Sequence, residues 1–147
     1  MDKIVFDDIQ AGQELSPVSH TVNQETFWKN AVGSFDYNPV HSDPEWVKTA
    51  QPFGIPVTVA HGMMTMSFML TLVTNWAYPS MGKITETDSK LIRPVQGGWT
   101  VNCSGIISEK HVIAPGKNFV IVELKAENQD GDLLALGQAK VVFPENN

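Results

Sequence analysis

An apolar stretch from residue 62 to about residue 78, GMMTMSFMLTLVTNWAY, constrains the fold more than any other part of the sequence. Its apolar residues are too dense to share one face of a helix, and in helical geometry they would surround it. A helix that is apolar on all sides is normally buried. The stretch is interrupted by Thr, Ser and Asn, and it is too short and too polar to cross a bilayer. We therefore expect a buried central helix over about residues 62–78.

Strand patterns follow this stretch, near residues 83–95, 99–113, 118–129 and 133–143. These segments are rich in Val, Ile and Thr and contain period-two alternation, as in FVIVELKAE. The sequences QGG, APGK and QDGD separate them, and the last is a strong hairpin signal. Antiparallel strands after one buried helix predict an α+β fold in which the sheet, over about residues 83–143, wraps around the helix.

The composition limits the classes of partner. The 147 residues carry a formal net charge of −6, which argues against nucleic acid because phosphate binding normally shows a basic excess. The single cysteine, Cys103, excludes an intrachain disulfide and a Cys-based zinc site, and we expect it to be an inert buried thiol. The N-terminus lacks the apolar region of a signal peptide. We expect one domain over residues 1–147, located in the cytoplasm.

A proline-rich segment, residues 33–61, precedes the central helix and holds residues typical of a catalytic site. Within DYNPVH, a carboxylate, an amide and an imidazole come from Asp36, Asn38 and His41. Because proline fixes its own φ and lacks an N–H donor, Pro39 predicts a shaped loop here instead of a regular helix. Long ordered connections are usually functional. We therefore expect residues 33–61 to form an active-site segment.

Shorter elements are expected around this segment. Capping residues before FWKNAV predict a short amphipathic helix that ends near Gly33. Asp43 and Pro44 predict the N-cap and the first position of a helical turn over PEWVKTA. Residues 3–6 and 15–22 have the composition of short strands.

FDDIQAGQEL near the N-terminus, DYNPVHSDPEW in the active-site segment and VAHGMMTMSF at the start of the central helix occur in this order. Together they resemble the MaoC-like dehydratases, the group that contains the (R)-specific enoyl-CoA hydratases. The resemblance implies the hot-dog fold, an antiparallel sheet wrapped around one long helix. It also implies thioester substrates of coenzyme A or acyl carrier protein, no cofactor beyond that carrier, and a homodimer or a hetero-oligomer with another hot-dog subunit.

The resemblance assigns roles to the matching residues. Asp36 and His41 match the family's catalytic pair, and Asn38 matches the amide that organises it. Gly62 matches the glycine whose backbone N–H receives the thioester oxygen. Hydration of an enoyl thioester needs a base for water, a proton donor for C2 and stabilisation of the enolate. We expect Asp36 to act as the base toward water and His41 as its partner and proton donor.

One position departs from the family pattern and bears on substrate size. The family usually has glycine immediately before the catalytic Asp, whereas this chain has Phe35. Either the role of that glycine has moved to Gly33, or Phe35 intrudes on the acyl pocket. Met63 and Met66 are expected in the core, and lining of an acyl tunnel is the second interpretation of these two residues. Arg93, the only arginine, either meets a phosphate of the carrier or forms a surface ion pair.

Other polar residues have simpler interpretations. His61 is expected to be structural and to brace the loop or the helix start by hydrogen bonding. His20 and His111 have no partner pattern and are expected at the surface. No metal site is expected, because no standard ligand spacing is matched by the candidate ligands Asp36, His41, Asp43 and His61.

The sequence thus predicts a hydro-lyase that reversibly adds water to a (2E)-enoyl thioester to give the (R)-3-hydroxyacyl thioester. One alternative is a (3R)-hydroxyacyl-ACP dehydratase subunit that works with a second hot-dog subunit. Another is a non-catalytic acyl-thioester-binding subunit, which would be expected to have lost the Asp or the His. A thioesterase on the same fold would attack the carbonyl carbon, and the DYNPVH pattern favours hydration instead.

Overall fold

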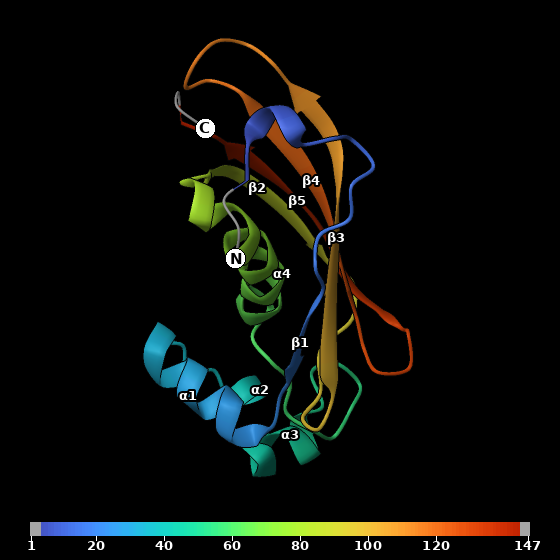
Figure 1. The fold of residues 1–147 in the computed structure, drawn as a ribbon. Helices are drawn as coiled ribbons and strands as arrows, with labels where there is room; N and C mark the ends of the chain where they lie inside the picture. The colour runs from blue at the N-terminus through green and yellow to red at the C-terminus, as the bar shows by residue number, and fades with distance from the viewer. Residues whose placement is uncertain (1–3, 145–147) are drawn as a thin grey trace.

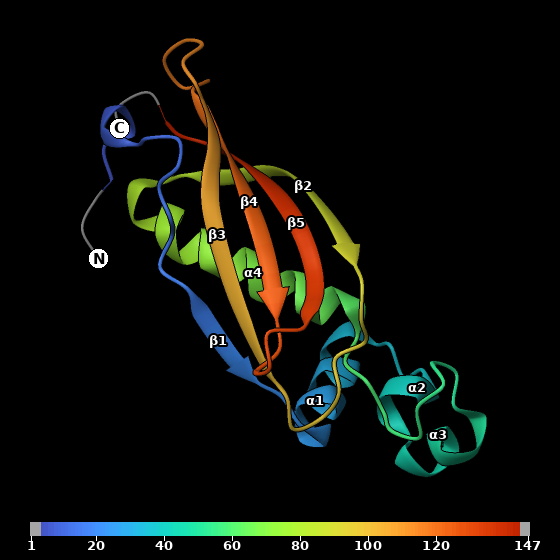
Figure 2. The same cartoon turned by 90° about the vertical axis from the view of Figure 1, so that its right-hand side faces the viewer.

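A long helix held against a curved sheet forms the body of the protein (Figure 1). The computed structural model describes residues 4–144. Within this range, helix α4 (Gly62–Ala77) lies against the concave side of a five-stranded antiparallel sheet, as the two perpendicular views show (Figures 1 and 2). The predicted α+β architecture, one central helix wrapped by an antiparallel sheet, is confirmed.

The strand order across the sheet is β1-β3-β4-β5-β2, so the edges are β1 and β2. The strands are β1 (Val18–Thr21), β2 (Lys83–Leu91), β3 (Thr100–His111), β4 (Phe119–Glu127) and β5 (Leu133–Val142). Each neighbouring pair is antiparallel. The expected strands are therefore present, although the first after the helix ends at Leu91, four residues before the predicted boundary.

Two glycines let α4 approach the sheet closely. A Cβ atom at Gly105 on β3 would lie 3.0 Å from Leu72 Cδ2, and one at Gly137 on β5 would lie 3.3 Å from Met69 Cε. Both helix residues are 1% exposed, and they form the core with inward-facing residues of the strands. Close packing of this kind holds α4 in one position along the sheet.

The expectation that α4 is buried on all sides is wrong for the single chain. Met64, Met69 and Val73 are buried, but Met63 is 65% exposed and Ser67 lies on the solvent side with it. The sheet covers only one side of the helix (Figure 1), which leaves an apolar strip uncovered. Within residues 4–144, no helix combines the length and the apolarity needed to cross a membrane.

The β4–β5 turn confirms the predicted hairpin. Asn128 is buried, and its Oδ1 accepts hydrogen bonds from the backbone N–H groups of Asp130 (3.0 Å) and Asp132 (2.8 Å). Gly131 supplies the positive φ of +83° that the turn requires. The turn therefore holds Asp132 in a fixed place at the end of the sheet.

The N-terminal region differs from the prediction at one of two places. The strand expected over residues 3–6 is wrong for the described residues 4–6, where the chain leads into a short 3₁₀ helix, η1 (Phe6–Asp8); residue 3 lies outside the described range. β1 falls inside the expected 15–22 segment and pairs with β3 at the sheet edge. A second 3₁₀ turn, η2 (Tyr78–Ser80), follows α4.

Three short helices gather at one end of the sheet, next to the start of α4 (Figure 2). They are α1 (Gln24–Ser34), α2 (Pro39–Ser42) and α3 (Pro44–Ala50). Asp43 caps α3 as predicted, because its Oδ1 accepts from the N–H groups of Glu45 (3.0 Å) and Trp46 (2.9 Å). This arrangement places the segment rich in candidate catalytic residues beside the N-terminus of the central helix.

Candidate active site

The turn that carries His41 is a helix, so the expectation of a non-helical loop is wrong. Pro39 occupies the first position of α2, where the missing N–H has no helical partner to lose. Asn38 is the N-cap, and its Oδ1 accepts from Val40 N at 3.2 Å. The motif NPVH therefore encodes a capped helical turn that fixes the direction of His41.

Helix α1 holds this turn in place through two side chains. Gln24 Nε2 donates to the backbone oxygen of His41 at 3.0 Å, and Trp28 Nε1 donates to that of Ser42 at 2.8 Å. The Thr58 hydroxyl in turn donates to Gln24 Oε1, which ties the segment before α4 to the same helix. The position of His41 thus depends on residues from α1 as well as on its own turn.

The end of α1 shows what residue 35 does. The helix does not stop at Gly33, as predicted, but runs through Ser34, and Phe35 follows with φ +56° and ψ +24°. This left-handed conformation favours glycine, since a side chain there is strained. Phe35 itself therefore occupies the position where the family has glycine, and its ring is 84% exposed.

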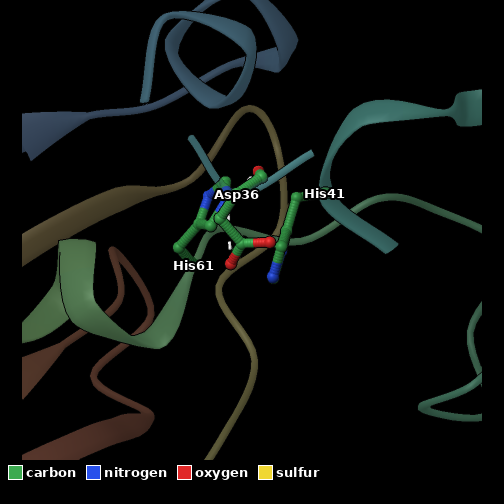
Figure 3. A group of neighbouring side chains, drawn as sticks. All are labelled: Asp36, His41 and His61. Atoms are coloured by element: carbon green, nitrogen blue, oxygen red, sulfur yellow. Dashed lines mark hydrogen bonds and ion pairs between the residues drawn. The ribbon is translucent and has the colours of Figure 1, made fainter. Parts of the chain in front are cut away.

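Asp36 follows directly and is held from both sides. Its Oδ1 accepts from Asn38 N at 3.2 Å, and its backbone oxygen accepts from His61 Nε2 at 3.0 Å. His61 Nε2 also lies 3.7 Å from Asp36 Oδ2 (Figure 3). About half of the Asp36 side chain remains exposed, so the carboxylate is accessible while its backbone is fixed.

His41 presents one free ring nitrogen. Its Nδ1 lies 2.8 Å from the carbonyl oxygen of Val59, and because a carbonyl only accepts, Nδ1 carries the proton. In the neutral ring, Nε2 then keeps its lone pair. The ring stacks on that of His61, with centroids 3.8 Å apart and planes at 26°. This geometry suits His41 to accept a proton at Nε2.

Burial of the ring lowers the pKa of His41 below its ordinary value of 6.5. The hydrogen bond to Val59 opposes this change, the neighbouring His61 adds to it, and the Asp36 carboxylate opposes it. Because the lowering effects prevail, His41 is neutral near pH 7 and is available as a base.

Gly62 begins α4 directly after His61. The N-cap residue His61 makes no side-chain capping hydrogen bond, so the His61 side chain does not occupy the amide end of the helix. A Cβ atom built on Gly62 would overlap Leu91 Cδ1. Glycine therefore allows close approach to the helix N-terminus, where backbone N–H groups and the helix dipole favour a negatively charged oxygen.

A cavity of about 430 Å³ is lined by His41 and Gly62, whereas Asp36 and His61 are not among its lining residues. Its lining is mostly apolar: His41, Phe53, Val59, Ala60, Gly62, Thr65, Leu91, Ile92, Arg93, Pro94 and Val95. Arg93 lies at this cavity and also pairs with Asp132, with Nη1 2.6 Å from Oδ2. An apolar hollow with an imidazole and a helix N-terminus in its wall fits a small acyl group whose polar end reacts.

The sequence model of the MaoC like domain matches residues 8–129. The chain belongs to the MaoC-like dehydratase family. A search of curated proteins finds no match.

Solved structures of MaoC-like and related proteins share the fold. A chain described as a monoamine oxidase regulatory protein from Archaeoglobus is 26% identical, with 99% of this chain and 97% of that chain covered and a TM-score of 0.84. R-hydratase PhaJ1 from Pseudomonas aeruginosa is 23% identical, with 98% and 88% covered and a TM-score of 0.79. A chain of the HadBC (3R-hydroxyacyl-ACP dehydratase) complex from Mycobacterium tuberculosis is 16% identical, with 90% and 96% covered and a TM-score of 0.71. These matches confirm the hot-dog fold.

The predicted substrate residues of this MaoC-like domain divide into two groups. Arg93 lines the cavity. Phe35, Met63 and Met66 do not line it in the single chain, and the first two are mostly exposed. The sequence analysis missed Thr65, which lines the cavity and is 4% exposed. Its spacing of three residues from Gly62 on a helix was the available signal.

The remaining histidines and the cysteine are placed as follows. His61 braces Asp36 by a hydrogen bond, as expected. The surface prediction is wrong for His20, whose Nε2 is buried and whose ring stacks on Phe68 with centroids 4.2 Å apart. His111 is partly exposed and contacts Glu109. Burial raises the pKa of the Cys103 thiol to about 11, which confirms an inert thiol.

Asp36, His41 and His61 bring one potential ligand atom each to within 4.8 Å of one another. Asp43 is not part of this cluster, because its carboxylate caps α3. The two imidazole rings stack, so their in-plane lone pairs run side by side and do not converge on one point. One nitrogen of each ring is also used in a hydrogen bond to a backbone carbonyl. The arrangement therefore favours proton transfer over metal coordination.

Proposed function

We propose that this protein is a hydro-lyase that interconverts a (2E)-enoyl thioester and the (R)-3-hydroxyacyl thioester. The observation that carries the proposal is a ring nitrogen of His41 within 4.8 Å of the Asp36 carboxylate, with His41 and Gly62 in the lining of one cavity. The family supports the hydro-lyase class, and the (R) configuration rests on the resemblance to (R)-specific hydratases.

The proposed reaction uses one water molecule held between Asp36 and His41. The oxygen of water forms a bond to C3 while one of its protons passes to the pair. A proton passes from the pair to C2, so that the elements of water are added and the pair is regenerated. His41 is neutral near pH 7, which allows Nε2 to share the role of base that the sequence analysis gave to Asp36.

Negative charge that develops on the thioester oxygen during attack is stabilised by a hydrogen-bond donor. The N–H of Gly62 is proposed for this role, since it begins α4 without a side-chain cap and carries no side chain that would block the thioester. Removal of one such donor costs roughly 10²- to 10³-fold in rate in other enzymes. Asn38 acts indirectly, because it caps the turn of His41 and its N–H holds Asp36.

The carrier and the partner subunit form the second part of the proposal. Arg93 is proposed to meet a phosphate of coenzyme A or of a carrier protein, because it is a cation at the cavity. Phe35 and Met63 are apolar and exposed on the single chain, which supports their burial against a second hot-dog subunit. The similar chain from the HadBC complex supports a hetero-oligomer as the alternative to a homodimer. Light scattering on the purified chain would show twice the 16.2 kDa mass if it dimerises alone.

A non-catalytic acyl-binding subunit is the alternative of a different class. The name of the Archaeoglobus structure includes a regulatory role, which is said of that protein. Retention of both Asp36 and His41, with ligand atoms within 4.8 Å of each other, favours catalysis here, because a binding protein needs no acid–base pair beside its cavity.

The test follows loss of the conjugated-enoyl absorbance with crotonyl-CoA, with a longer enoyl-CoA and with the same acyl groups on a carrier protein. Asp36→Asn and His41→Ala should each lower kcat/KM by at least about 10²-fold with the fold intact. Asp88→Asn and His111→Ala serve as matched controls, since both residues lie away from the cavity.

A dehydrogenase specific for (R)- or (S)-3-hydroxyacyl thioesters reads the configuration of the product. Wild-type protein that makes the (R)-product while both site variants fail supports the proposal. Folded wild-type protein that hydrates neither carrier form, alone or with a hot-dog partner subunit, would contradict it.

A further inference from the structure

Most buried polar side chains of residues 4–144 have hydrogen-bond partners, and the enclosed atoms that lack one are His20 Nε2 and His61 Nδ1. The described residues include five such side chains: Thr58, His61, Thr65, Ser80 and Asn128. Away from the cavity, the Ser80 hydroxyl accepts from Ile4 N and the Asn128 amide holds the β4–β5 turn. At the site, His61 Nδ1 is buried without a partner. Buried polar atoms are normally hydrogen-bonded, but neither His61 nor His20 lines the cavity, so these two atoms do not by themselves indicate a ligand there.

Thr65 is another residue whose side-chain hydrogen-bonding group has no partner among residues 4–144. Two other hydroxyls on α4, those of Ser67 and Thr71, donate to the carbonyl four residues earlier, each at 2.8 Å. Within residues 4–144, the Thr65 hydroxyl makes no such bond, and it is not one of the fully enclosed unpaired atoms, so it is open to the cavity. Its residue is only 4% exposed and lines the cavity with His41 and Gly62. A hydroxyl that lines the cavity and has no protein partner is available to donate to an occupant of the cavity.

Helix geometry places this hydroxyl next to the Gly62 amide. Side chains on an α-helix lean toward its N-terminus, and a residue covers the turn before its own Cα. Thr65 therefore covers the turn that begins at Gly62, which is three residues earlier on the same face. An oxygen that binds the Gly62 N–H at the helix end would also lie near the Thr65 hydroxyl.

We propose that Thr65 Oγ1–H is a second hydrogen-bond donor to the thioester oxygen, beside the Gly62 N–H. This inference rests on the proposed function. Thr65 transfers no proton. Its bond to the oxygen becomes stronger as the carbonyl becomes an enolate, and an interaction that is stronger in the transition state raises kcat. A two-donor site would also fix the orientation of the thioester, because a single donor allows rotation about one hydrogen bond.

The test compares Thr65→Val, which removes the hydroxyl at nearly constant volume, with Thr65→Ser, which retains it. Thr65→Val should lower kcat/KM about 10- to 10²-fold, mostly through kcat, and Thr65→Ser should stay within about fivefold of wild type. Thr65→Ala gives a second hydroxyl-free variant in case valine disturbs packing. Thr74→Val, an exposed position on the same helix, is the matched control.

A readout independent of turnover uses butyryl-CoA labelled with ¹³C at C1, a saturated thioester that cannot be hydrated. Its carbonyl band in the infrared should lie at higher wavenumber when bound to Thr65→Val than when bound to wild type, because one hydrogen bond is lost. If wild type and Thr65→Val are equally active and the carbonyl band has the same position in both, the inference is overturned. The proposed function would then still stand. Inactive wild type with a band that still moves would reject the hydratase and retain the thioester contact.

Discussion

Two helix ends border the active-site segment, and residues 35 and 62 occupy them for different physical reasons. Phe35, after α1, has a left-handed backbone that favours glycine, yet its side chain is 84% exposed. Gly62, at the start of α4, has an ordinary φ, yet a side chain there would overlap Leu91. The restriction at residue 35 is on the backbone conformation, and a side chain is tolerated there. The restriction at residue 62 is on the space for a side chain.

This difference explains why Phe35, in place of the glycine usual in the family, leaves the arrangement of the candidate site intact. Left-handed backbone costs a non-glycine residue roughly 1–2 kcal/mol, which a folded domain can absorb. A side chain at Gly62 would instead act on the cavity itself, through Leu91. Glycine is therefore favoured by the backbone at residue 35, whereas at residue 62 it leaves room for Leu91 beside the helix N-terminus.

The largest expected effect is on catalysis by Gly62→Ala. The new methyl group would displace Leu91, a cavity-lining residue that is half exposed and able to rotate outward. We expect kcat/KM to fall about 10²-fold or more while thermal unfolding changes by only a few degrees. Activity and calorimetry on the same preparation measure both.

A double variant, Gly62→Ala with Leu91→Ala, separates the two causes of that loss. Recovery of part of the activity would show that the overlap with Leu91 matters, because the clash is then absent. An active Gly62→Ala single variant would instead show that a methyl group at residue 62 is tolerated and that the comparison is wrong.

The next effect concerns the pKa of His41. Asp36, after α1, and His61, before α4, shift this pKa in opposite directions. Burial lowers its pKa most, His61 lowers it further, and Asp36 raises it. The acid limb of kcat/KM should therefore lie below the ordinary value of 6.5, with activity lost as the pH falls through the lowered pKa. Asp36→Asn should lower the pKa of His41 further, and His61→Gln should raise it. NMR titration of the His41 ring measures each shift, and shifts of the same sign in both variants would refute this account.

The smallest effect is on stability at the end of α1. Phe35→Gly removes left-handed strain and should stabilise the monomer by about 0.5–1 kcal/mol. Gly33→Ala lies two residues earlier, inside the helix, at a negative φ with no heavy atom within 4 Å of the new Cβ, and should stabilise by a similar amount. Urea unfolding measures both. A loss of stability in Phe35→Gly alone would show that the ring is buried in an assembly.

The sequence predicted the elements whose signals are local and periodic. The dense apolar run at 62–78 gave the central helix, alternation gave the strands, and QDGD gave the β4–β5 hairpin. Asp43 followed by Pro44 gave the start of α3 with the correct cap. In each case the hydrogen bonds or the buried face that determine the element lie within a few residues.

The errors have physical causes of a different kind. Pro39 was interpreted as a helix breaker, but at the first position of a helix it loses no hydrogen bond. Gly33 was taken as the helix end because glycine favours left-handed backbone, yet Phe35 adopts it instead. The Thr65 hydroxyl was missed because its importance depends on the cavity, whose walls come from α4 and from residues 91–95.

The hydrogen bonds from α1 to the turn of His41 divide the protein into parts of unequal stability. That turn buries only Val40 and relies on Gln24 and Trp28 of α1, whereas Gly62 begins a helix packed on the sheet. Segments with few buried contacts open locally before a domain unfolds. Opening of the α2 turn would carry His41 away from Gly62 while the sheet and α1, whose Phe27 belongs to the core, stay folded. Heat should therefore inactivate this protein at a lower temperature than that of global unfolding. His41, one member of the proposed acid–base pair, belongs to a less stable segment than the core.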